Sequence, residues 1–141
     1  MSSLPVSQGH YRIATRSGDL IFTAGMTPRK DGVLIRKGKI SSGTPVSDYR
    51  ACVELAVQNA LQAAQSQMAP GERISRVLNT TVYVAAEDGF EGHSKIADLA
   101  SDHLFARLPE IEPGARTAVG VYSLPGNSPV EIALVVAVQS P

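Results

Sequence analysis

The C-terminal stretch, residues 113–138, constrains the fold most strongly because it holds two apolar runs around a dense group of turn formers. The runs span residues 117–121 and 130–138, and Leu-Pro-Gly-Asn-Ser-Pro lies between them at 124–129. This pattern predicts strand, turn, strand, in the form of a terminal hairpin. The second run is almost continuously apolar, which is typical of a strand covered on both faces.

Two charged residues interrupt this apolar terminus. Arg116 stands at the start of the first run and Glu131 lies inside the second. A carboxylate in an apolar strand is costly unless it is paired or hydrogen-bonded. We therefore look for chemistry at these two residues.

β-Branched and aromatic residues also gather in upstream runs that are typical of strands. We expect strands over residues 11–15 and 20–24, joined as a hairpin, and a long strand over 74–84. Residues 26–43 are rich in glycine and lysine, and we expect this segment to be mobile apart from a short extended piece at 32–35.

Two amphipathic helices are expected between these strands. The first opens at Thr44, a suitable N-cap before Pro45, and its apolar residues recur at helical spacing as far as Met68. The second follows Asp88 as its cap and ends before Leu108.

The order strand–strand, helix, strand, helix, strand–strand predicts a single α+β domain over residues 1–141, with one sheet and two helices on one of its faces. The other face of the sheet must then meet water or another subunit. An apolar C-terminal strand does not suit water, so we expect self-association through the open sheet face.

Composition excludes several partners. Lys plus Arg and Asp plus Glu both number 13, and this zero formal net charge argues against duplex DNA or an anionic membrane as a partner.

Cys52 is the single cysteine and is expected to pack as a small hydrophobe. His10, His93 and His103 lack metal-ligand spacing and are expected at the surface or at the rim of a site, where His10 could touch a ligand cleft beside Tyr11. Without a signal-peptide pattern or a membrane-length apolar run, we expect a soluble cytoplasmic protein.

The C-terminal stretch also carries a distinctive order of residues. Arg116 is followed by Val119 and Val121, then by Leu124-Pro125, then by Val130-Glu131-Ile132. This order resembles the C-terminal motif of the RidA family, also called YjgF or L-PSP endoribonuclease-like. The resemblance continues upstream at Gly9-His10-Tyr11, at Phe22-Thr23-Ala24-Gly25, and at Thr80–Val84 followed by Phe90. Lys-Gly-Lys at 37–39 and Asp-Gly-Phe at 88–90 resemble a branch with a chorismate-mutase-like label.

This resemblance implies a homotrimer with a chorismate-mutase-like fold, in which the sheets form a central β-barrel with the helices outside. Three ligand clefts would lie between subunits. Better-known members of the family hydrolyse reactive 2-imino or 2-enamino acids to 2-keto acids and ammonia, with no metal or cofactor. The implied partner is a small metabolite that bears a carboxylate.

Three residues match positions that line this cleft in the family. Arg116 presents a rigid fork that suits a substrate carboxylate, or it is a strand-end arginine paired with Asp or Glu at the surface. Glu131 positions water or moves a proton, or it forms a structural salt bridge, with Arg116 as one option. Tyr11 covers the substrate, or it is a core aromatic.

Other cleft positions depart from the family pattern. Ala24 replaces a serine beside Gly25, and Met26 replaces a glutamine, so this wall becomes more apolar. Ser94 stands where active relatives carry asparagine, and Ala118 replaces a cysteine. These five positions are expected to line the substrate site, and their differences suggest a bulkier ligand or a binding role alone.

Three functional hypotheses are compatible with these residues and with the resemblance. The leading hypothesis is an imine deaminase, and the alternative is a trimeric module that binds small carboxylic acids without turnover. The third is endoribonuclease activity, against which the neutral charge and the absence of a paired histidine acid and base argue. The basic residues between Arg29 and Lys39 are either a solvated loop or an RNA contact.

Overall fold

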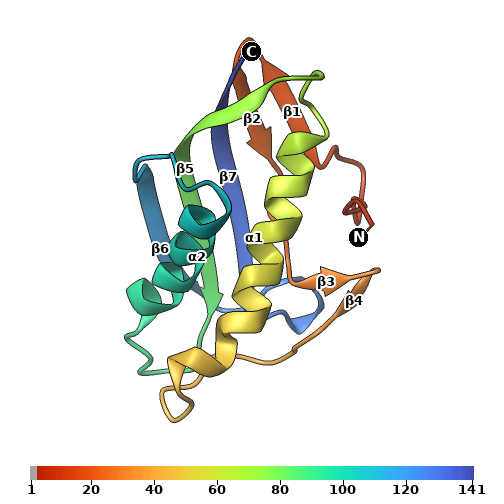
Figure 1. Cartoon of the computed structure of the whole chain (residues 1–141). Coiled ribbons are helices and arrows are strands. Elements are labelled where there is room, and N and C mark those ends of the chain that lie inside the picture. Colours follow the sequence, from red (N-terminus) through yellow and green to blue (C-terminus); the bar gives the residue numbers. More distant parts are fainter. Residues whose placement is uncertain (1–2) are drawn as a thin grey trace.

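The computed structural model describes residues 3–141 and shows a five-stranded mixed sheet with two helices on one of its faces (Figure 1). The strands of this sheet are β1 (Ala14–Ser17), β2 (Leu20–Thr23), β5 (Arg73–Ala85), β6 (Ala115–Val121) and β7 (Val130–Gln139). The helices are α1 (Arg50–Gln65) and α2 (His93–Arg107). Smaller elements are the hairpin β3 (Arg29–Lys30) and β4 (Val33–Leu34) and the 3₁₀ turns η1 (Val46–Tyr49) and η2 (Pro125–Asn127). The predicted α+β class with two helices is confirmed.

The strand order is β1-β2-β7-β5-β6, with β5 and β6 parallel and the other neighbours antiparallel. The predicted terminal hairpin is therefore wrong, because β6 and β7 both pair with β5 and lie on either side of it. A strand–helix–strand unit closes as a parallel crossover, which places β6 beside β5. The segment at 122–129, which includes the turn formers at 124–129, then carries the chain across the end of β5 to its other edge.

The core lies between the sheet and the helices. Helix α1 buries an alanine-rich face, including Val53, Val57 and Ala60, against the strands. Along β7 every second residue from Val130 to Val138 is buried, while the residues between them are half-exposed. The near-continuous apolar run thus has one face against the helices and one on the open side of the sheet.

Both helices begin differently from the prediction. Residues 46–49 form a 3₁₀ turn before α1, and the Thr44 hydroxyl bonds the Ser41 hydroxyl at 2.8 Å instead of capping the helix. Helix α2 begins at His93 because the backbone N–H of Phe90 bonds the Glu87 carbonyl, which makes residues 87–90 a turn. Within residues 3–141, neither helix is long and apolar enough to cross a membrane.

The segment at 26–43, which we expected to be mobile, is tied into the fold at several points. Ile40 is fully buried and bridges to Ala86 beside the end of β5. The backbone N–H of Gly38 bonds the Asn127 carbonyl at 2.8 Å. These contacts fix the β3–β4 hairpin next to the turn before β7.

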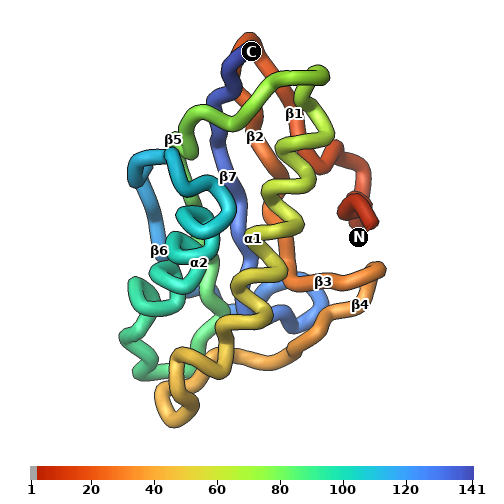
Figure 2. The backbone as a smooth tube through the Cα atoms, in the orientation of Figure 1, coloured from red at the N-terminus to blue at the C-terminus, as the bar shows by residue number. Residues whose placement is uncertain are grey.

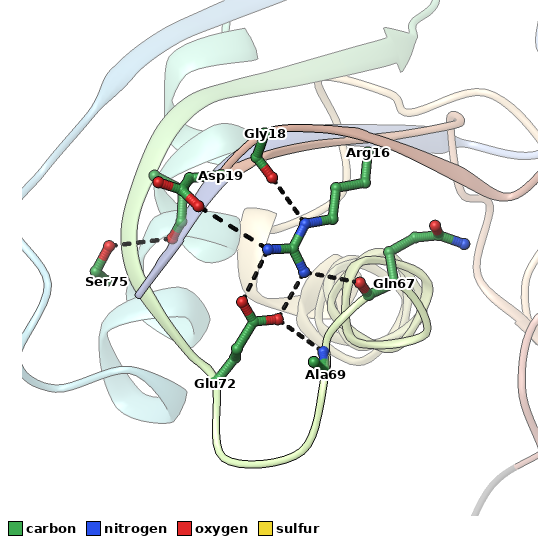
Figure 3. Close-up of polar contacts among 8 residues, drawn as sticks. Arg16, Gly18, Asp19, Gln67, Ala69, Glu72 and Ser75 are labelled. Carbon is green, nitrogen blue, oxygen red and sulfur yellow. Dashed lines mark hydrogen bonds and ion pairs between the residues drawn. The ribbon is translucent and has the colours of Figure 1, made fainter. Parts of the chain in front are cut away.

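An ion-pair cluster fastens the β1–β2 hairpin to the loop between α1 and β5 (Figure 3). Arg16 donates two hydrogen bonds to the carboxylate of Glu72, at 2.6 and 2.8 Å, and a third to the Gln67 carbonyl. Glu72 also accepts the backbone N–H of Ala69 at 2.7 Å. These bonds hold the pKa of Glu72 at about 2, well below its ordinary value, with the Arg16 hydrogen bond as the main cause. The cluster contains none of the predicted site residues and serves the fold.

Candidate functional site

One of two cavities that contain predicted site residues lies between the N-terminal arm, the end of β2 and the start of β7. It has a volume of about 490 Å³, and we name it the Glu131 cavity. Its lining includes Tyr11, Gly25, Met26, Arg29 and Glu131. Residues of the N-terminal arm between Ser3 and Gln8 form one wall, and Figure 2 shows this arm folding back near the β3–β4 hairpin.

Glu131 faces the open side of the sheet because its neighbours Val130 and Ile132 are fully buried on the helix side. A Cβ atom on Gly25 would lie 2.5 Å from Oε2 of Glu131, so a residue without a side chain is what leaves room for this carboxylate. Burial raises the pKa of Glu131 above its ordinary value, and no hydrogen bond to its carboxylate is made within residues 3–141. A carboxyl group that holds its proton more tightly than an exposed glutamate is a candidate for proton transfer to or from a ligand.

Tyr11 lies at the mouth of the same cavity. Its side chain is 49% exposed, which excludes the core-aromatic alternative. The phenol oxygen accepts the backbone N–H of Gln8 at 3.1 Å, so the hydroxyl hydrogen is left to donate elsewhere. Tyr11 can therefore cover a ligand and hydrogen-bond to it.

Ala24 and Met26 continue the line of β2 past its last paired residue. Met26 exchanges two backbone hydrogen bonds with Ile132 and its side chain is 7% exposed. Ala24 bonds through its backbone N–H to the Ile13 carbonyl. Neither side chain offers a hydrogen bond. Met26 lines the Glu131 cavity and makes that part of its wall apolar, whereas Ala24 packs against the core.

Arg116 lies at a second cavity, of about 340 Å³, on the side of the sheet that α2 covers. Its guanidinium donates to Oδ1 of Asp98 at 2.8 Å, to Oγ of Ser101 at 3.1 Å and to Oγ of Ser94 at 2.9 Å. The ion pair with an acidic residue, which was the structural alternative, is thus present. The Arg116 side chain remains 26% exposed, so the guanidinium is held in place and still open to a ligand.

The first turn of α2 runs along β6 beside Arg116. Ser94 contributes its hydroxyl to Arg116, and Ala118, two residues further along β6, packs against the core. Beyond it, a Cβ atom on Gly120 would lie 2.6 Å from Nε2 of His93, whose ring stands edge-on to Phe90. Of the two predicted residues, Ser94 therefore contacts Arg116 directly, whereas Ala118 is part of the packing beneath β6.

The side chains of Arg116 and Glu131 lie on opposite faces of the sheet. Arg116 is level with Thr80 of β5, which is buried under the helices, whereas Glu131 is level with Tyr83 on the open face. Strand β5 separates the two side chains, so one chain does not bring them together. The predicted alternative of a salt bridge between Arg116 and Glu131 is wrong for the same reason.

Sequence reasoning missed Asn59 and Arg29. Asn59 is 6% exposed on α1 and donates hydrogen bonds to the carbonyls of Thr27 and Arg29, at 3.1 and 2.9 Å. A polar residue on the buried alanine stripe of α1 was the available signal for Asn59. Arg29 lines the Glu131 cavity, but its position within a run of basic residues hid it.

The histidines and the cysteine take other places. We expected His103 at the surface, but it lies between α1 and α2. There it contacts Gln58 at 3.3 Å and Glu54 at 3.7 Å. Cys52 is buried, its thiol bonds the Tyr49 carbonyl, and burial raises its pKa to about 11, so it is not a nucleophile. Within residues 3–141, no three His, Cys, Asp or Glu residues gather to hold a metal ion.

Comparisons with known proteins agree with these features. The family model described as Endoribonuclease L-PSP matches residues 1–138. The protein Atu1372 from Agrobacterium tumefaciens, whose function is described as unknown, is 28% identical with a TM-score of 0.84, over 97% of this chain and 86% of that one. Protein TCP17 of Trypanosoma cruzi is 26% identical over 82% of this chain and 73% of its own.

A further solved structure shares the fold at lower identity. TdcF from E. coli, which has serine bound, is 17% identical with a TM-score of 0.70, over 95% of this chain and 92% of that one. The family match over nearly the whole sequence agrees with the motif around Arg116 and Glu131. The chain therefore belongs to the L-PSP endoribonuclease family, which is the RidA/YjgF family.

Proposed function

We propose that the protein is a homotrimeric hydrolase that converts 2-imino or 2-enamino acids to 2-keto acids and ammonia. Each catalytic cleft would join the Arg116 cavity of one subunit to the Glu131 cavity of the next. The observation that carries this proposal is the separation of the two half-sites. One cavity holds Arg116 and the other holds Glu131 and Tyr11, and the side chains of Arg116 and Glu131 lie on opposite faces of one sheet.

The open face of the sheet supports assembly. Its exposed apolar residues include Leu20, Phe22 and Val119, at 37, 45 and 38% exposed. Strand β6 is also an edge strand with one side unpaired. A trimer in which three sheets form a central barrel would cover these surfaces and place copies of the two cavities side by side.

In the proposed reaction, Arg116 holds the carboxylate of the imino acid with its guanidinium fork. Glu131 takes a proton from water, which attacks the imine carbon, and the C–N bond then breaks as the nitrogen receives protons and leaves as ammonia. Tyr11 covers the ligand and donates its hydroxyl hydrogen to the imine nitrogen or the water. Free imines already hydrolyse in water, so an acceleration of a few kcal/mol is sufficient.

Asp98 shares the Arg116 guanidinium in the unliganded chain. Its side chain is 60% exposed, so the ion pair is solvated and weak, and a ligand carboxylate can share the fork. The three contacts to α2 keep the guanidinium in one orientation, which lowers the entropy lost on binding. The ion pair between Arg116 and Asp98 would thus hold the guanidinium in position without preventing a ligand carboxylate from binding to it.

The direct test couples the purified protein to an amino-acid oxidase that generates the imine, with release of keto acid as the readout. We expect release faster than in buffer, and loss of that gain in Arg116→Ala. Arg107→Ala, which removes an exposed arginine at the end of α2, is the matched control and retains activity. Release no faster than in buffer, or an unchanged rate in Arg116→Ala, would reject the proposal.

A second candidate is a trimeric module that binds small carboxylic acids without turnover. The apolar side chain of Met26 in the wall of the Glu131 cavity favours it, because it supplies no hydrogen bond to orient water. Calorimetric binding of 2-keto acids with no turnover on any imine would select this candidate. Failure to bind any carboxylate would remove it.

A further inference from the structure

Arg29 stands out in the Glu131 cavity because it has no ion-pair partner among residues 3–141. Its guanidinium has five N–H donors, and among the described residues only one of them makes a hydrogen bond, to the Gly32 carbonyl at 3.0 Å. Its Nε is buried and has no hydrogen-bond partner in the part of the chain that the structure describes. A guanidinium with unused N–H donors beside a cavity is suited to bind a hydrogen-bond acceptor that comes from outside the chain.

The surroundings fix this arginine in position. Asn59 bonds the backbone carbonyls of Thr27 and Arg29 from α1, on either side of the fully buried Pro28. On the other side, Gly126 has a φ of 68°, and a Cβ atom there would lie 2.6 Å from a terminal guanidinium nitrogen of Arg29. The side chain is thus clamped between the β3–β4 hairpin and the turn before β7, which is the preorganisation expected of a binding residue.

Two carboxylates also face the Glu131 cavity, and they bear on which ligand it can accept. Asp31 is exposed at the rim and accepts the hydroxyl of Ser3 at 2.9 Å. Glu131 is half-buried, and burial favours its neutral form. Arg29 is the positive charge among the cavity's lining residues, so an anionic group is expected to lie at Arg29, away from Asp31 and Glu131.

From this arrangement we infer that the protein prefers a 2-imino acid that carries a second acidic group on its side chain. This inference rests on the proposed function, in which Arg116 of a neighbouring subunit holds the first carboxylate. Arg29 takes the second carboxylate, while the imine carbon lies near Glu131. The volume of about 490 Å³ lies within the range of sites that hold ligands much larger than a three-carbon acid.

The test compares two keto acids by calorimetry. 2-Oxoglutarate and 2-oxopentanoate share a five-carbon chain, and the second has a methyl group where the first has its distal carboxylate. We expect the wild-type protein to bind 2-oxoglutarate about tenfold more tightly or better, since a charge-assisted pair is at stake. Arg29→Gln should remove this preference and leave the affinity for 2-oxopentanoate within about twofold. Lys30→Gln, at the exposed neighbouring position, is the matched control and should keep the preference.

The outcomes separate the two proposals. Arg116→Ala should weaken the binding of both keto acids by the same factor, so that the ratio of their affinities stays the same. If Arg116→Ala leaves both affinities unchanged, the proposed role of Arg116 is rejected, while the role of Arg29 is not affected. Equal binding of the two acids by the wild-type protein, or no binding of 2-oxoglutarate, would overturn the role of Arg29. That role is also overturned if Arg29→Gln keeps the preference, or weakens both acids alike at an unchanged melting temperature.

Discussion

A methyl group at residue 25 would displace the carboxylate of Glu131. In Gly25→Ala the new Cβ would lie 2.5 Å from Oε2 and 2.6 Å from Cδ of Glu131, whereas ordinary contact begins at 3.4 Å. The carboxylate must therefore move by about 0.9 Å. A misplacement of about 1 Å at a reacting group can reduce turnover on the order of 100-fold.

The same change should cost the fold little. The clashing atoms are the far end of a flexible side chain, and Gly25 does not have the positive φ that only glycine adopts easily. We therefore expect the free energy of unfolding to change by about 1 kcal/mol or less. Gly43→Ala is the matched control, because a Cβ at Gly43 meets nothing within 4 Å.

The assay is the oxidase-coupled release of keto acid, measured together with urea unfolding. Gly25→Ala should be stable and nearly inactive, and Gly43→Ala should resemble the wild type in both. In the background of Glu131→Ala, Gly25→Ala should cost no more than about twofold in further activity, because both changes act on one group. Full activity in Gly25→Ala, or independent losses in the double variant, would refute the role given to Glu131.

Three other predictions concern the fold and the assembly. Because Arg16 lowers the pKa of Glu72 from 4.5 to about 2, the stability from this pair is complete above pH 4.5 and is lost as pH falls toward 2, so urea midpoints of Glu72→Gln should vary less with pH over that window. Gly114→Ala should unfold or aggregate, as judged by circular dichroism, because its Cβ would overlap the Val77 carbonyl, a backbone atom that cannot move aside. Phe22→Asp, on the open sheet face, should reduce the mass in light scattering from three chains of 14.9 kDa to one, and a retained trimer would contradict the proposed interface.

Local sequence patterns predicted the elements well because each depends on residues close together in the chain. The helical spacing of apolar residues from Val53 to Leu61 and the β-rich runs around Ile21 and Val82 were enough to identify α1, β2 and β5. Strand pairing was less predictable. The turn formers at 124–129 match a hairpin, but pairing with β5 depends on the crossover through α2, which no local pattern reveals.

The site, like the fold, was predicted only in part: its residues were identified, but their arrangement in space was not. Motif resemblance identified Arg116, Glu131 and Tyr11, but the faces they occupy follow from the register with β5 and could not be read from their spacing. Arg29 was hidden because a basic residue in a glycine-rich loop usually meets water. Its burial depends on Asn59, thirty residues away along the chain, which fixes the loop against α1.

Mixing two inactive variants tests the composite cleft most directly. Arg116→Ala subunits would keep Glu131, and Glu131→Ala subunits would keep Arg116, so every mixed trimer would contain one intact cleft. Random co-assembly in equal amounts should restore about one quarter of the wild-type activity, whereas each variant alone should show almost none. Mixed trimers that remain as inactive as either parent would contradict a site shared between subunits.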